Sequence, residues 1–329
     1  MNIQTSEYQT NFNMDFIERT LIDIACCESG MLENNLICSR KEFFNFTELN
    51  KGIPITIPFI PFILKSNNFY ELSISEFGDT IFGNNSIGYI GTKLSYKTSV
   101  FVSKYRIKNI FRKIINDYKK DILKTKIKIS ELKDKFVNLG AFQTRNIPHH
   151  GHEKIIEMML EHCNAVVINP IIGPKKPGDI KTEKLKYIYE SILKPRFNNR
   201  IFFIPIRANM FYAGPREAIH HSYIREWLGF SHFSVGRDHA GSDNFYKPDE
   251  AIKIFKNKKF SINILKHNGA FFCKLCNKTL LKGSCNHNRN IFVEISGSRL
   301  RYLLKNRKNY EFVSDDVQEW ASKNFKSLF

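Results

Sequence analysis

The sequence predicts an α/β protein whose centre is a doubly wound, mostly parallel sheet. Four short apolar runs in the middle of the chain are typical of buried parallel strands. They cover residues 136–142, 165–168, 200–206 and 232–235. Amphipathic segments that predict helices alternate with these runs, near 152–163, 183–194, 215–228 and 248–256. Such alternation leads to a parallel sheet with helices on both faces.

The first part of the chain, residues 1–132, predicts a mostly β domain. Short apolar runs such as 53–60 are separated there by turn signals at 67–68 and 83–85. A lysine-rich stretch over 104–135 predicts a helical connector to the sheet.

Length and composition fit an enzyme-sized protein with more than one domain. The 329 residues can bury a substantial core, and we expect the α/β domain over 133–260 and a smaller C-terminal part, a metal-binding loop with helices, over 261–329. No apolar run approaches the roughly 18 to 20 residues of a membrane span, and the polar first residues are not a secretory signal. We therefore expect a cytoplasmic protein without membrane contact.

The net charge of +18 raises the question of nucleic-acid binding. The lysines are scattered among many Asn, Ile and Phe residues and do not form one basic stripe. A solvated basic surface that attracts small anions is therefore favoured over a nucleic-acid partner.

The segment that follows the first predicted strand of the sheet has the residues of a phosphate-binding entrance. Arg145 offers a planar fork for a tetrahedral oxyanion, flanked by the amides of Gln143 and Asn146. His149 and His152 have helical spacing at a helix start, where free N–H groups already favour anions. Alone, the histidine pair is more typical of a helix cap with surface histidines, but the neighbouring anion ligands favour phosphate binding.

A second loop, 236–241, follows the last predicted strand of the sheet. Gly236, Ala240 and Gly241 are small enough to let backbone N–H groups approach a ligand. The alternative for the charged Arg237 and Asp238 of this loop is a structural ion pair.

Three cysteines and a histidine in the C-terminal part have the spacing of a zinc site. Cys273 and Cys276 form a Cys-x-x-Cys pair, and Cys285 and His287 follow after a polar loop. Four protein ligands leave no open position, so the metal would be structural. Free reduced thiols are the alternative, and His287 is the least certain ligand. The other cysteines do not suggest a disulfide scaffold.

The sequence resembles the ATP sulfurylase (sulfate adenylyltransferase) family. The run Gln-Thr-Arg-Asn-Ile-Pro-His-His-Gly-His-Glu is similar to a signature of that family. Segments similar to three further family motifs follow in the same order, at 173–179, 212–218 and 236–241. The stretch 295–301 and the cysteine cluster extend the resemblance to about Arg301.

The resemblance implies a nucleotidylyltransferase-like α/β fold preceded by a PUA-like β domain, and a transfer of adenylyl from ATP to sulfate with release of pyrophosphate. Sulfate would contact Gln143, Arg145 and Ala240. ATP, entering with Mg²⁺, would contact a larger set. This set is Gln143, Thr144, Arg145, Asn146, Gly236, Arg237, Asp238 and His239.

The same resemblance assigns the chemistry to a short segment and to distant basic residues. Thr144, Arg145 and Asn146 would form the catalytic group, and His149 and His152 would meet the β- and γ-phosphates. Arg301 would reach phosphate, although an exposed basic residue on an amphipathic helix is an equal alternative. The resemblance also implies a homo-oligomer and, without a Gly-x-x-x-x-Gly-Lys-Ser/Thr run, no fused kinase.

Three departures from the family pattern keep other functions open. Ile147 and Pro148 reverse the usual order, while His150 and Phe211 stand where arginine is expected. Fewer arginines near an anion site would allow an adenylyltransferase for another oxyanion. A degenerate non-catalytic relative, or a basic zinc-containing nucleic-acid-binding protein, is the non-enzymatic alternative.

Overall fold

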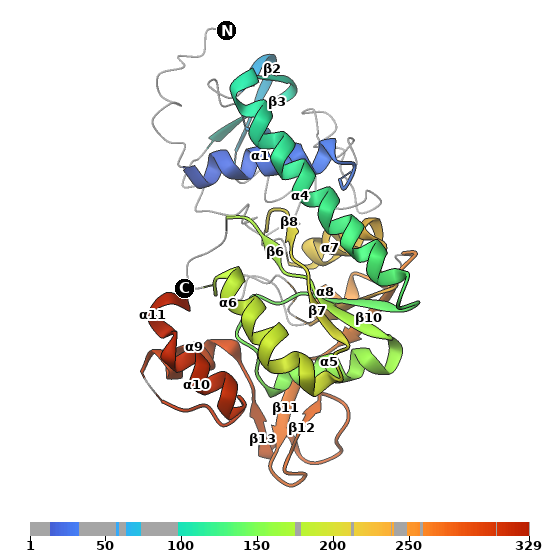
Figure 1. Cartoon of the computed structure of the whole chain (residues 1–329), viewed down its shortest axis with the longest axis vertical. Coiled ribbons are helices and arrows are strands. Elements are labelled where there is room, and N and C mark those ends of the chain that lie inside the picture. Colours follow the sequence, from blue (N-terminus) through green and yellow to red (C-terminus); the bar gives the residue numbers. More distant parts are fainter. Residues whose placement is uncertain are drawn as a thin grey trace.

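The computed structural model describes residues 14–32, 57–58, 64–73, 98–174, 179–211, 214–237, 239, 249–256, 259–306 and 308–328. Figure 1 shows a helical and β-stranded N-terminal end, a central parallel sheet, and a C-terminal end with a small sheet and short helices. No helix in these ranges is both long and apolar enough to cross a membrane.

The central sheet has five parallel strands in the order β10-β9-β4-β5-β7. The strands are β4 (Leu139–Phe142), β5 (Ala165–Ile168), β7 (Ile201–Phe203), β9 (His232–Gly236) and β10 (Asn263–His267). The predicted doubly wound, mostly parallel sheet is thus confirmed. β10 was not predicted, because Asn263, Lys266 and His267 interrupt its apolar pattern, and the sheet therefore extends beyond the expected boundary at residue 260.

The strand order reverses beside β4, which pairs with β5 on one side and β9 on the other. The chain runs outward through β5 and β7, then returns to add β9 and β10 at the opposite edge. Loops that leave the carboxyl ends of β4 and β9 diverge at this point and open a crevice, which is the usual ligand position in open α/β sheets.

Alternate residues of β5 point into two separate cores, as expected for a central strand covered on both faces. Ala165 and Val167 contact one core, and Val166 and Ile168 contact the other. Helices of the first core are α1 (Met14–Glu28), α4 (Asn109–Lys133), α7 (Pro215–Leu228) and α8 (Glu250–Lys253). Helices of the second are α5 (His150–His162), α6 (Thr182–Tyr187), α9 (Gly297–Lys305), α10 (Asp315–Lys323) and α11 (Phe325–Leu328).

Two predicted elements have different ends in the structure. The helix expected near 183–194 comprises α6, a π-helical turn η2 (Ile188–Leu193) and the start of the 3-10 turn η3 (Lys194–Phe197). The strand expected over 200–206 is interrupted at Pro205, which has no N–H for a ladder bond. Its remainder, β8 (Ile206–Arg207), pairs with β6 (Ile171–Ile172) in a separate parallel pair.

The N-terminal part contains both strands and helices. β1 (Ile57–Pro58), β2 (Leu64–Ser73) and β3 (Thr98–Ile107) form an antiparallel sheet in the order β1-β3-β2. The expected connector is the long helix α4. α1 was not predicted, and it packs into the core of the parallel sheet through residues such as Ile22. A PUA-like domain over 1–132 therefore stays a prediction.

The C-terminal part carries a second antiparallel sheet in the order β12-β11-β13. Its strands are β11 (Ala270–Cys273), β12 (Lys278–Leu281) and β13 (Phe292–Glu294), with a 3-10 turn η4 (Arg289–Ile291) between the last two. This small sheet packs against α5 on the same side of the parallel sheet as α9 and α10 (Figure 1).

Candidate active site

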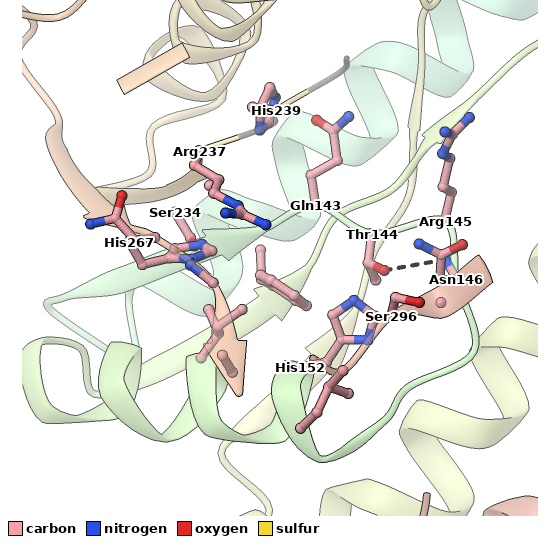
Figure 2. Close-up of a pocket in the computed structure, with 18 of the residues that line it drawn as sticks. Gln143, Thr144, Arg145, Asn146, His152, Ser234, Arg237, His239, His267 and Ser296 are labelled. Atoms are coloured by element: carbon pink, nitrogen blue, oxygen red, sulfur yellow. Dashed lines mark hydrogen bonds between the residues drawn. The ribbon is translucent and has the colours of Figure 1, made fainter. Parts of the chain in front are cut away.

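A cavity of about 470 Å³ lies at the carboxyl ends of β4 and β9, within the usual size range of small-molecule sites. Among its lining residues are many of those singled out in the sequence. They are Gln143, Thr144, Arg145, Asn146, His152, Gly236, Arg237, His239 and Arg301. Figure 2 shows Thr144, Arg145, Asn146 and His152 on one side of the cavity and Arg237 and His239 on the other.

The loop after β4 is held in shape by its own side chains. Thr144 is 7% exposed, and its hydroxyl accepts a hydrogen bond of 3.3 Å from the backbone N–H of Asn146 (Figure 2). The Gln143 side-chain amide donates to the Met210 sulfur at 3.6 Å. Its buried oxygen has no hydrogen-bond partner within the described residues, so this acceptor is available to a ligand in the cavity.

Two guanidinium groups meet one carboxylate beside this loop. Arg145 Nη1 lies 3.5 Å from Asp179 Oδ1. Arg301 comes from α9 and donates a short hydrogen bond to Asn146 Oδ1. Burial and the nearby Arg145 lower the pKa of Arg301. Because both arginines line one cavity, the site favours an anion that would relieve their repulsion.

The two histidines at the start of α5 have different surroundings. His149 is the N-cap, and its Nδ1 accepts a 3.3 Å hydrogen bond from His152 N–H. The rings stack with centroids 3.9 Å apart, and of the pair only His152 lines the cavity. α5 therefore begins at His150, two residues earlier than expected, and Pro148 precedes the helix.

Burial keeps both rings neutral. It lowers the pKa of His149 to about 4, and burial together with His149 lowers that of His152 well below its usual value. His152 Nδ1 is buried and has no hydrogen-bond partner within the described part of the chain.

The loop after β9 approaches the cavity through Gly236. A Cβ atom at this position would lie 3.0 Å from the His267 ring, so only glycine fits without displacing that ring. Arg237 pairs with Glu294 at 3.0 Å. The predicted site residues Asp238, Ala240 and Gly241 lie outside the described residues.

Some cavity residues were missed in the sequence. His267 ends β10 and Glu294 ends β13, and neither strand was predicted. Gly297 is a further example, because a Cβ there would lie 3.0 Å from the Asn146 side chain. The sequence signal for His267 and Glu294 was that each is a polar residue at the end of a strand, which is where ligands bind in open α/β sheets.

Phe211, which replaces an expected arginine, is not among the residues that line the cavity. It is 5% exposed, and its ring meets His220 edge to face at 5.4 Å. Arg19 of α1 lies 5.9 Å from the Phe211 ring centroid and donates to the Met210 carbonyl at 2.7 Å. A positive charge therefore lies near this position, supplied from another element. His150 is half-buried, with its pKa lowered by burial and Arg196.

The predicted metal ligands converge on one point. The ligand atoms of Cys273, Cys276, Cys285 and His287 lie within 4.8 Å of one another. The sulfur of Cys285 is 3.7 Å from those of Cys273 and Cys276. His287 Nδ1 lies 3.3 to 3.4 Å from the three sulfurs.

These distances match a tetrahedral zinc site. In a tetrahedral site, metal–ligand bonds of about 2.3 Å to sulfur and 2.0 Å to nitrogen place two sulfurs about 3.8 Å apart and a sulfur and a nitrogen about 3.5 Å apart. The turns around the cluster have left-handed residues at Asn277 (φ 50°) and Gly283 (φ 103°).

Comparison with known proteins identifies the family. A profile of the ATP-sulfurylase family matches residues 101–319. The chain belongs to the ATP-sulfurylase family. The match extends from β3 to α10 and includes both loops of the cavity and the cysteine cluster.

Curated members of the family resemble the central part of the chain. A sulfate adenylyltransferase from Staphylothermus marinus is 41% identical over 173 residues, which cover 52% of this chain and 45% of that protein. One from Carboxydothermus hydrogenoformans is 38% identical over 194 residues, covering 57% and 51%. The chain spans about half the length of these relatives.

A solved structure shows the same kind of fold. The hexameric APS kinase from Thiobacillus denitrificans superimposes with a TM-score of 0.56 at 11% identity, covering 97% of this chain and 64% of that chain. At this identity the similarity concerns the fold alone.

Proposed function

We propose that this protein is a sulfate adenylyltransferase, which converts ATP and sulfate to adenylyl sulfate and pyrophosphate. One observation carries the proposal. The loops after β4 and β9 meet at the switch point of the sheet, and Arg145, Arg301 and His152 converge there on one cavity of about 470 Å³.

Sulfate would bind beside the loop after β4. Arg145 supplies the bidentate cation, and the second N–H of the Gln143 amide, beside the one that donates to Met210, supplies a neutral donor. In the absence of an anion Arg145 lies against Asp179, so an arriving sulfate would compete with that carboxylate for the guanidinium. Ala240, outside the described residues, would add a backbone contact.

The nucleotide would enter as MgATP and lie between the two loops. The cavity carboxylates Asp179 and Glu294 are paired with arginines, so the phosphates and water would provide most Mg²⁺ ligands. Gly236 and Arg237 would face one side of the nucleotide, and Thr144 and Asn146 the other. His152 and Arg301 would face the pyrophosphate end.

The protein contributes positioning and charge stabilisation. Sulfate is a weak nucleophile and the α-phosphorus is surrounded by negative oxygens, so both anions must be held in line. Arg301 and the N–H of neutral His152 would stabilise charge on the departing pyrophosphate. Because both substrates are bound together, no covalent enzyme intermediate is needed.

A pyrophosphate-release assay tests the function directly. Purified protein with MgATP should release pyrophosphate when sulfate is added and should be nearly silent without it. Parallel reactions with selenate, molybdate and phosphonates measure oxyanion selectivity. Equal rates with and without sulfate, or a faster rate with another oxyanion, would reject sulfate as the substrate.

We also propose that the cluster of Cys273, Cys276, Cys285 and His287 holds one structural Zn²⁺. The distances between the four ligand atoms support this assignment, and so does their number, since four protein ligands complete a tetrahedral site. The metal would supply fixed geometry to the small C-terminal sheet and would take no part in the reaction.

We expect copies of the chain to assemble into a homo-oligomer. The support is indirect, since the similar solved structure is a hexamer. Size-exclusion chromatography with light scattering measures the mass of the assembly. A mass equal to that of one chain would contradict a homo-oligomer.

A further inference from the structure

Two buried residues of α7 connect His239 in the cavity to the protein interior. His239 Nε2 lies 2.9 Å from His221 Nδ1. His221 Nε2 in turn lies 3.2 Å from Glu217 Oε1. Glu217 and His221 are 0% exposed, and their i,i+4 spacing places them on one face of the helix. None of the family motifs identified in the sequence accounts for His221.

The direction of the hydrogen bonds from Glu217 through His221 to His239 follows from the contacts of Glu217. Glu217 Oε1 accepts a 2.8 Å hydrogen bond from the backbone N–H of Phe211, so this oxygen acts as an acceptor. Its neighbour His221 Nε2 should therefore carry the proton. The contact is at ion-pair distance but is not aligned as a linear hydrogen bond, so the carboxylate orients the imidazole mainly through its charge.

A neutral His221 with its proton on Nε2 offers only a lone pair at Nδ1. His239 must then donate to it from Nε2, and the lone pair of His239 is left on Nδ1. Both rings are neutral, because burial and Arg225 lower the pKa of His221 well below its usual value. Burial, His221 and Arg225 do the same for His239, with a smaller contribution from His267 and an opposing one from Glu217.

We propose that Glu217 and His221 are positioning residues that hold His239 in the Nε2–H tautomer, so that Nδ1 accepts a hydrogen bond from the nucleoside part of ATP. Phosphate oxygens are acceptors and would repel a second acceptor. ATP carries suitable donors in the exocyclic amine and the ribose hydroxyls. The inference rests on nucleotide binding in the proposed function but not on sulfate as the second substrate.

The tautomer is measured by long-range ¹H–¹⁵N correlation spectra of protein with labelled histidines. The set of ring signals that is missing from the spectrum of His239→Leu belongs to His239. The wild type should show a protonated Nε2 and an unprotonated Nδ1, whereas His221→Phe should shift His239 toward a mixture. His220→Phe is a matched control, because His220 is also buried on α7 but lies outside the series. An unchanged tautomer in His221→Phe would overturn the proposal.

Glu217→Gln keeps the side-chain shape. This second variant tests the same proposal if His221→Phe does not fold. Its amide carries no charge to orient His221, so the His239 tautomer should again shift, by less than in His221→Phe. Melting temperatures near those of the His220→Phe control show that the fold is intact. A folded Glu217→Gln protein with the wild-type tautomer would contradict the role of Glu217.

Nucleotide binding identifies the donor. Calorimetry compares ATP with 6-chloropurine riboside triphosphate, 2′-deoxy-ATP and 3′-deoxy-ATP, each of which lacks one donor. One of them should bind the wild type about tenfold more weakly than ATP. His239→Leu should remove that difference without changing the affinity for tripolyphosphate.

A His239→Leu protein that loses tripolyphosphate and ATP affinity equally would show that His239 contacts phosphate, and the proposal would fail. These measurements need no turnover. A protein inactive with sulfate could therefore still pass them, and an active one could fail them, so the two proposals are tested separately.

Discussion

Arg145 shows how a residue's role depends on its immediate neighbours. It leaves the end of β4 beside a carboxylate, Asp179, and a second guanidinium, Arg301. The carboxylate holds the fork near the cavity, and Arg301 adds a second positive charge beside it. An anion in this position would gain two charge-assisted contacts that water cannot replace at equal strength.

We expect Arg145→Lys to lower sulfate-dependent pyrophosphate release at least ~10²-fold, because lysine keeps the charge but loses the planar fork. Arg112→Lys is the control, since Arg112 makes a partly exposed ion pair with Glu28 far from the cavity. Initial rates of sulfate-dependent pyrophosphate release at saturating MgATP measure the effect of each variant. A lysine variant within a few-fold of wild type would show that charge alone is sufficient.

His149 is expected to act through α5 and not on the phosphates. His149→Ala removes the capping acceptor and should cost about 1 kcal/mol of stability. His149→Asn retains a capping oxygen and should keep the melting temperature and turnover closer to wild type. His152→Ala, which removes a cavity group, should lower turnover most. If His149→Asn were as inactive as His152→Ala at an unchanged melting temperature, His149 would contact substrate directly.

At the scale of elements, α5 links the metal cluster to the cavity. Its packing on β4 is close, because a Cβ at Gly140 would lie 2.8 Å from the Cys163 sulfur. On another side the helix packs against β11 and β12. Cys273 ends β11, and Cys276 lies in the turn that leads to β12. His152 therefore depends on a small sheet whose hairpin is closed by the proposed metal.

Zinc removal should lower thermal stability first and activity only as a consequence. We expect one zinc per chain by elemental analysis of protein purified without chelator. Cys273→Ser should lose the zinc and melt at a lower temperature, whereas Cys163→Ser, buried outside the cluster, should retain the metal. Absence of zinc from the wild type, or an unchanged melting temperature in Cys273→Ser, would contradict the assignment. If His287→Ala retained its zinc, another residue would supply the fourth ligand, and the assignment of the three cysteines would stand.

At the scale of the whole molecule, buried histidines link folding to pH. Eight are buried or partly buried with their pKa lowered, in each case chiefly by burial. They are His149, His150, His152, His220, His221, His232, His239 and His267. Burial lowers the pKa of His149 and His267 to about 4 and that of His220 to about 3.

Stability should be greatest above pH ~6.5 and fall as the pH is lowered toward ~4. In this range the unfolded histidines bind protons and the folded ones do not, at up to about 1.4 kcal/mol per histidine per pH unit. Asp23 and Glu153 oppose this trend, because burial raises the pKa of Asp23 to about 6 and that of Glu153 above its usual value, and the folded state then binds their protons first. Two carboxyls do not offset eight imidazoles.

Melting temperatures between pH 8 and pH 5 check this expectation, with zinc content measured at each pH. His220→Phe should flatten the dependence. A melting temperature that stays constant over this range would show that the histidines are not kept neutral in the folded protein.

The sequence by itself determined the local chemistry. Periodicity identified four strands of the parallel sheet, and spacing identified the three cysteines and the histidine whose ligand atoms converge, since both report interactions between residues close in the chain. It also placed Gln143, Arg145 and Asn146 at a strand end. The predicted roles of these residues in substrate binding stay predictions until the assays above are done.

Only the tertiary structure decided which distant residues meet. Nothing local in the chain specifies that β9 lies beside β4, that Arg301 reaches Asn146 across 155 positions, or that His221 lies behind His239. The strand β10, and with it His267, escaped prediction because its polar residues hide the apolar pattern at the sheet edge. These contacts depend on strand order and helix packing, which arise from burial summed over the whole core and not from any short segment.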